Sequence, residues 1–123
     1  MIDVEWEHAG LDCCMRHNPH LGNIPLGYVA VPDGHPLRRE GLDLDACLDS
    51  HGGITHAGEL PDDQQRRWWV GVDMGHLWLR DVTVSRTADG MAYTSHRTDE
   101  ECKEEVNFLA DQIAAITEEI EPL

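Results

Sequence analysis

One long amphipathic segment decides the fold: residues 98–121 read TDEECKEEVNFLADQIAAITEEIE. Thr98 and Glu101 stand three positions apart, which is the spacing of a capping box at the start of a helix. Apolar residues then recur every three or four positions on one helix face: Cys102, Val106, Leu109, Ile113, Ile116 and Ile120. Phe108 and Ala110 widen this stripe, and Pro122 ends it. We predict a helix over residues 98–121 whose stripe packs across a sheet or forms a seam between two copies in a homodimer.

The residues before this helix predict a sheet. Short segments with alternating or continuous apolar residues, bounded by Gly, Pro, Asn and Asp, are typical of strands. Such segments lie at residues 2–6, 11–16, 26–31, 67–73 and 77–85, with a glycine-rich stretch at 52–58 and a short helix at 42–48. The sequence therefore predicts one compact α+β domain over residues 1–123, an antiparallel or mixed sheet of about five strands covered by the C-terminal helix.

The charge balance restricts the kinds of partner. The 123 residues include 24 Asp and Glu against nine Lys and Arg, which gives a net charge of −15. Because affinity for nucleic acid comes largely from cationic side chains, direct binding to DNA, RNA or an anionic membrane is not expected. Such an acidic surface favours solubility, and it also fits a contact with a basic protein or an inhibitor that imitates nucleic acid.

The cysteines and the hydropathy pattern indicate a cytoplasmic protein. No apolar run reaches the length of a membrane span, and no leader precedes the first strand. The four cysteines, Cys13, Cys14, Cys47 and Cys102, include no CxxC pair and are expected to be reduced. Cys13 and Cys14 lie on opposite faces of an extended segment, which leaves one of them able to be exposed.

A set of polar residues predicts a ligand site. His51 precedes two glycines, and Asp73 and His76 follow the apolar run at residues 68–72. If neighbouring strands bring them together, these three residues can hold zinc or another divalent metal, with His35 as a fourth ligand or a base. The same residues also fit a metal-free pocket or a structural hydrogen-bond network.

His35, Trp68 and Trp69 are candidate binding residues. The two tryptophans point to opposite faces of a strand, so one belongs to the core and the other is free to cover a pocket or contact a partner. Arg66 and Arg67, next to them, either bind an anion or remain solvated.

Three blocks of sequence carry a family resemblance: GYVAVPDGHPL at residues 27–37, HGGIT at 51–55 and WWVGVDMGH at 68–76. Together they resemble a family of small bacteriophage proteins with the patterns GYVxVPxGHP, HGG[IL]T and WWxGxDxxH. The resemblance marks His35, His51, Asp73 and His76 as the polar residues of the family pattern. It implies a phage origin but no particular activity. Eight Arg against one Lys also suits a GC-rich genome, such as that of a phage of actinobacteria.

The chain departs from this family pattern at three places. Leu26 and Met74 stand where relatives often have cysteines, and Leu77-Trp78-Leu79 replaces an Ala-Gly-Asp run. A metal site that depends on those thiols would therefore be incomplete here.

Two classes of function follow from these observations. The first is a phage accessory protein that binds a host protein or a small ligand, with the acidic surface and the long helix as contacts. The second is a small metal-dependent hydrolase in which His51, Asp73 and His76 hold the ion. An acidic inhibitor that imitates nucleic acid is a further alternative, and the sequence leaves open whether the protein is an enzyme.

Overall fold

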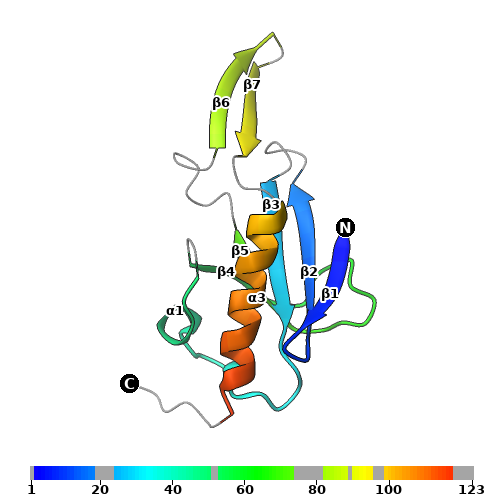
Figure 1. Cartoon of the computed structure of the whole chain (residues 1–123), viewed down its shortest axis with the longest axis vertical. Helices are drawn as coiled ribbons and strands as arrows, with labels where there is room; N and C mark the ends of the chain where they lie inside the picture. Colours follow the sequence, from blue (N-terminus) through cyan, green and yellow to red (C-terminus); the bar gives the residue numbers. More distant parts are fainter. Residues whose placement is uncertain are drawn as a thin grey trace.

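The computed structural model describes residues 2–18, 24–50, 53–73, 82–88, 90–95 and 99–117. The elements within these ranges are, in order, β1 (Val4–His8), β2 (Leu11–Asn18), β3 (Ile24–Ala30), η2 (Pro36–Arg38), α1 (Leu44–Cys47), β4 (Ile54–Gly58), β5 (Trp69–Asp73), β6 (Val82–Thr87), β7 (Gly90–Ser95) and α3 (Asp99–Ala115) (Figure 1). This arrangement confirms the predicted α+β fold, with a five-stranded sheet and a C-terminal helix.

The five-stranded sheet is antiparallel throughout, in the order β1-β2-β3-β5-β4. A two-residue turn joins β1 and β2, and its residues Ala9 and Gly10 have φ angles of 53° and 78°. Both residues of a type I′ turn adopt this left-handed conformation, which matches the twist of the strands. The strands predicted at 2–6, 11–16, 26–31 and 67–73 are all present with ends shifted by up to two residues, and the glycine-rich stretch forms β4.

A second, two-stranded sheet pairs β6 with β7, from Val82 opposite Ser95 to Thr87 opposite Gly90. In Figure 1 this hairpin extends beyond the upper end of the five-stranded sheet. Strand β7 was not predicted, because only two large apolar residues, Met91 and Tyr93, alternate along its sequence. The predicted strand at 77–85 is present only from Val82, and residues 77–81 lie outside the described ranges.

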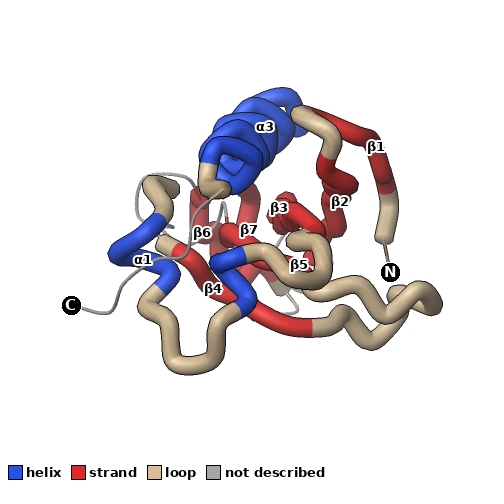
Figure 2. The backbone as a smooth tube through the Cα atoms, turned by 90° about the horizontal axis from the view of Figure 1, so that it is seen from below, coloured by secondary structure: helices blue, strands red, loops and turns tan. Residues whose placement is uncertain are grey.

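One face of the five-stranded sheet packs against α3 (Figure 2). The helix residues buried there are Cys102, Val106, Leu109, Ala110 and Ile113, each with no exposed surface. They form one apolar cluster with side chains from β2, β3 and β5, namely Cys13, Met15, Val29, Val70 and Val72. A Cβ atom at Gly27 of β3 would lie 2.2 Å from Cγ2 of Val106, so only glycine allows α3 to approach the strand this closely.

The other face of the sheet carries a smaller apolar cluster. Cys14, Tyr28, Ala30 and Trp69 from three strands contact Leu60, which belongs to the loop between β4 and β5. In Figure 2 this loop follows β4 along the side of the sheet that lies away from α3. Trp69 has no exposed surface, so the loop completes a second core.

The C-terminal helix is shorter than predicted. It ends at Ala115, and Ile116 and Thr117 are not helical, so the predicted end at Glu121 is wrong. The amide of Ile116 donates to the carbonyl of Ile113 at 3.2 Å, a tight closing turn. The β-branched residues Ile116 and Thr117 have a lower helix propensity, and the acidic residues Glu118 and Glu119 are unfavourable at the carboxyl end of a helix, where the helix dipole is negative. Thr98 and Ile120 lie outside the described residues.

Burial of the helix stripe bears on the predicted homodimer. The residues from Cys102 to Ile113 that form the stripe are buried against the sheet of the same chain. They are therefore not available for a seam between two copies.

Among the described residues, none of the helices has the length and apolar character needed to span a membrane.

Candidate functional site

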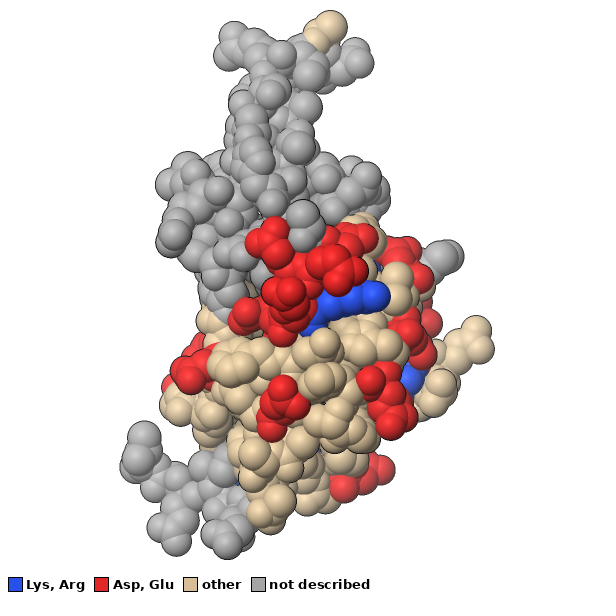
Figure 3. All heavy atoms as spheres, viewed as in Figure 1, with Lys and Arg blue, Asp and Glu red and all other residues tan. Residues whose placement is uncertain are grey.

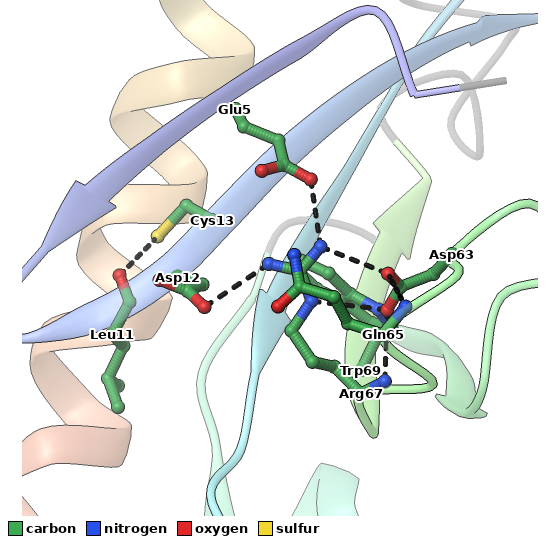
Figure 4. Close-up of polar contacts among 8 residues, drawn as sticks. All are labelled: Glu5, Leu11, Asp12, Cys13, Asp63, Gln65, Arg67 and Trp69. Carbon is green, nitrogen blue, oxygen red and sulfur yellow. Dashed lines mark hydrogen bonds and ion pairs between the residues drawn. The ribbon is translucent and has the colours of Figure 1, made fainter.

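The loop between β4 and β5 places a buried carboxylate at the centre of a polar network (Figure 4). The side chain of Asp63 is 2% exposed. It accepts hydrogen bonds from the backbone amides of Gln65 and Arg67 at 3.1 and 3.0 Å. It also accepts from Nε and Nη2 of Arg67 at 3.2 and 3.0 Å, and from Nε1 of Trp69 at 2.8 Å. The carboxylate thus joins the loop to the first residue of β5.

Arg67 connects this loop to β1 and β2 on the same face of the sheet. Its Nη2 lies 2.9 Å from Glu5 on β1, and its Nη1 lies 3.2 Å from Asp12 on β2. Hydrogen bonds from Arg67 hold the pKa of Asp63 well below its usual range, and hydrogen bonds to Asp63 raise the pKa of Arg67. Both groups remain charged near neutral pH, so Arg67 is an internal ion-pair partner rather than the solvated residue that the sequence analysis allowed.

The two tryptophans lie on opposite faces of the sheet, as the extended backbone predicts. Trp69 is fully buried, donates to Asp63 and lies 4.7 Å from the guanidinium carbon of Arg67, so it is a core residue. Trp68 is partly buried against the helix-side cluster, and the guanidinium carbon of Arg38 lies 5.7 Å from the centre of its ring. Trp68 and Arg38 line a hollow of about 310 Å³.

His35 closes the carboxyl end of α3. Its Nε2 lies 2.8 Å from the carbonyl oxygen of Ile113, and its Nδ1 accepts from the amide of Leu37 at 3.0 Å. Because a carbonyl can only accept, these partners assign the ring proton to Nε2. The last carbonyls of a helix lack the usual α-helical donors, and His35 gives the carbonyl of Ile113 a second donor beside the amide of Ile116. Both ring nitrogens are occupied, and this does not support His35 as a fourth metal ligand or a base.

The predicted metal site falls mostly outside the described residues. His51 and His76 are not described, and Asp73 is described only as the last residue of β5, opposite Leu26 of β3. Within the described ranges, no three His, Cys, Asp or Glu residues form a group able to hold a metal ion. The metal-binding set of His51, Asp73 and His76 therefore stays a prediction.

Two histidines attach α3 to the edge of the sheet. His8 of β1 lies 2.9 Å from Asp111, and His17 of β2 lies 2.8 Å from both Asp99 and Asp3. Hydrogen bonds to Asp99 and then to Asp3 raise the pKa of His17. The hydrogen bond from His17 lowers the pKa of Asp3. These imidazoles serve as links between elements.

The described cysteines on the sheet and on α3 are inaccessible thiols. Cys13 and Cys14 lie on opposite faces, as predicted, and both are fully buried, so neither is the exposed thiol that the extended backbone allowed. The reason is that α3 covers one face and the loop carrying Leu60 covers the other. Burial raises the pKa of Cys13, Cys14 and Cys102 to about 12, which keeps these thiols protonated and poorly nucleophilic.

The outer face of α3 is acidic and carries an exposed aromatic residue. Between Asp99 and Ala115 the helix has six acidic residues and one basic residue, Lys103. Figure 3 shows acidic side chains gathered over the upper, N-terminal part of this helix. Phe108 is 49% exposed, so its predicted place in the buried stripe is wrong. Two residues after Val106, its side chain is turned by about 200° around the helix axis and therefore lies on the opposite side of the helix. We call the exposed residues Glu100, Glu104, Phe108 and Asp111 the acidic face of α3.

The roles of Asp63 and Phe108 were not predicted from the sequence. Asp63 stands among loop residues. Its distances along the chain, four positions to Arg67 and six to Trp69, are too common to mark it as part of a site.

Comparison with protein-family models, with curated proteins and with solved structures found no match to this chain. Function is therefore inferred from the geometry of the described residues.

Proposed function

We propose that this chain is a cytoplasmic bacteriophage accessory protein that binds a basic protein of its host through the acidic face of α3. The observation that carries the proposal is Phe108, a large apolar side chain left half exposed between Glu104 and Asp111 on a helix whose opposite face is fully buried. A partly exposed aromatic residue surrounded by charge is typical of a binding anchor with a polar rim.

Charge complementarity indicates the class of partner. Glu100, Glu104 and Phe108 repeat at intervals of four positions, so they line up along one side of the helix. Lys103, the one base of α3, lies 5.5 Å from the ring of Trp6 on β1, beside the sheet rather than on this line. A partner with a basic surface would be attracted at long range and would then bury Phe108.

A position-specific crosslinking experiment tests this proposal. A photo-crosslinking amino acid replaces Glu104 on the acidic face, or Glu40, an exposed acid in the loop before α1, as the matched control. Each protein is irradiated in an extract of an actinobacterial host at low and at high salt. We expect a basic host protein to crosslink from position 104 but not from position 40, and to be lost at high salt.

The purified partner then gives the quantitative test. Phe108→Ala should weaken binding by about tenfold or more, as for a buried anchor residue. The double charge reversal Glu100→Lys and Glu104→Lys should remove the salt dependence as well as the affinity. Equal crosslinking from both positions, or binding that salt does not change, would contradict the proposal.

The same experiment distinguishes the alternatives. Crosslinks only to a second copy of this chain would replace the host partner with a homodimer. A captured DNA-binding protein that DNA displaces would identify the acidic face as an imitation of nucleic acid. The hydrolase alternative has its own test, which is the metal content of the purified protein beside an Asp73→Ala/His76→Ala variant that remains folded.

A further inference from the structure

A hollow at one end of the five-stranded sheet gathers basic residues in this acidic chain. The β1–β2 turn, the segment after β3 and the segment before β5 form its walls, at the lower end of the sheet in Figure 1. The ionic residues of the lining are Arg38, Arg66, Arg67, Asp12 and Asp33. The lining thus holds one more arginine than aspartate in a chain of net charge −15, and carboxylates outside it, those of Glu5, Glu59 and Asp63, pair with Arg66 and Arg67. Its volume of about 310 Å³ is that of a small-molecule site.

Two of these arginines pair with exposed carboxylates. Arg38 pairs through Nη1 with Asp33, whose side chain is 98% exposed. The Nε atom of Arg66 lies 3.0 Å from Glu59, which is 52% exposed. Ion pairs of this kind contribute little to stability, so a bound anion can replace the carboxylate at low cost. Arg67 differs, because the buried carboxylate of Asp63 holds it in place.

Trp68 fixes the position of Arg38. The guanidinium of Arg38 lies over the indole ring, and Trp68 itself packs against the helix-side cluster. The guanidinium carbon lies 5.7 Å from the centre of the ring, within the range of a cation–π contact, and such a contact leaves the N–H donors of the guanidinium able to bind an oxyanion. The ion pair with the exposed carboxylate of Asp33 shows that the guanidinium of Arg38 binds an oxyanion here.

We propose that this hollow binds the phosphate group of a small phosphorylated ligand, with Arg38 and Arg66 as binding residues and Trp68 as the residue that positions Arg38. A phosphate monoester carries nearly two negative charges at neutral pH, and its three oxygens can bind two guanidinium groups at once. It therefore competes effectively with the single carboxylate of Asp33. Acidic residues other than those paired with the three arginines oppose this weakly, because salt screens charges beyond about 8 Å. The site is separate from the acidic face of α3.

An NMR titration tests the proposal on the full chain. Isotope-labelled protein is titrated with inorganic phosphate, with adenosine monophosphate, and with adenosine as the probe that lacks phosphate. The signals followed are Nε–H of Arg38 and the indole N–H of Trp68, with the indole N–H of Trp6, which donates to Asn107, as the internal reference. We expect saturable shifts of the first two signals with both phosphate probes and none with adenosine.

Three variants give changes of opposite sign. Arg38→Gln should weaken binding of adenosine monophosphate by about tenfold or more, because it removes charge-assisted hydrogen bonds. Arg39→Gln removes the same charge from a residue that does not line the hollow, and it should change binding by less than about twofold. Asp33→Asn should strengthen binding by roughly threefold, because it removes the competing carboxylate.

Several results would overturn the proposal. One is the absence of saturable shifts with either phosphate probe. Another is an equal loss of binding in Arg38→Gln and Arg39→Gln, which would indicate a diffuse charge effect. A third is unchanged binding in Asp33→Asn. A well-dispersed amide spectrum identical to the parent's outside the hollow establishes that each variant is folded.

Discussion

On one face of the sheet α3 buries five apolar side chains completely, whereas the other face is covered by an irregular loop built around the buried carboxylate of Asp63. The difference follows from the backbone. A helix pairs its own amides and carbonyls, so it needs only an apolar side to cover a sheet. A loop does not, and the amides of Gln65 and Arg67 here find their acceptor in the side chain of Asp63. A face closed by a helix is thus stabilised by apolar burial, and one closed by a loop also needs a satisfied polar network.

The largest expected effect breaks the loop-covered face. Asp63→Ala should lower the free energy of unfolding by about 4 kcal/mol, because it leaves Arg67 and Trp69 without their buried acceptor. Urea unfolding measures this loss. The matched control is Asp62→Ala at the neighbouring acid, whose partly exposed side chain lies 3.5 Å from Arg16, and this change should cost less than about 1 kcal/mol. Similar costs for the two substitutions would contradict the role assigned to Asp63.

A slightly smaller effect is expected on the helix-covered face. Leu109→Ala removes a fully buried side chain and should cost about 3 kcal/mol through lost burial and the cavity left behind. This loss should be nearly the same at about pH 7 and about pH 2.5, since no titrating group is removed. The loss in Asp63→Ala should instead shrink in acid. Because the pKa of Asp63 is lowered in the folded state, its ionised carboxylate stabilises the protein fully at pH values above its ordinary pKa of 3.8. This stabilisation is lost as the pH falls from 3.8 through the pKa of the folded state.

The close approach of α3 to β3 gives a third test. Gly27→Ala should cost about 2 kcal/mol, because the added Cβ meets Val106. In a double-mutant cycle, Val106→Ala should relieve much of this cost, so the two changes together should be clearly less damaging than their sum. Additive effects in thermal or urea unfolding would mean that the helix moves away freely and that Gly27 is not required.

The smallest expected effect concerns the link between α3 and the sheet. The raised pKa of His17 means that its stabilising contribution is complete below the unfolded-state value of about 6.5 and is lost as the pH rises through the folded-state value. His17→Gln should therefore destabilise the protein more at about pH 5.5 than at about pH 9, by less than about 1 kcal/mol, since the partners are exposed. Thermal unfolding of both proteins across this range gives the comparison, and a pH-independent difference would contradict the ion-pair role.

Local patterns account for the parts of the fold that were predicted. The alternation of apolar residues in 2–6 and the continuous run at 26–31 identified β1 and β3, and the spacing from Cys102 to Ile113 identified α3 and its buried side. The same kind of reasoning placed the end of the helix too late, because the apolar residues Ile116 and Ile120 continue the pattern beyond the point where the helix stops. Periodicity reports which side of an element is apolar, and it does not report where that element ends.

The candidate sites could be predicted only in part. Trp68 and Trp69 were assigned to opposite faces, but which of them is buried depends on the loop that covers Trp69. His35 stood out as a polar residue between Gly34 and Pro36, and its partner, the carbonyl of Ile113, is 78 positions away. Contacts between residues so far apart leave no periodic signal in the sequence.

The sequence by itself determined the α+β class, the four strands with clear apolar patterns, the acidic character of the chain and the face that α3 buries. Only the tertiary structure decided that Phe108 is exposed among acids, that Asp63 and Arg67 close the second core, and that Trp68 and Arg38 meet at one hollow. The physical reason is that backbone geometry repeats at fixed intervals, so one stretch of sequence reveals it. A polar network or a binding site instead forms where the fold brings distant side chains within a few ångströms, and specificity at those places comes from pairing and burial rather than from spacing along the chain.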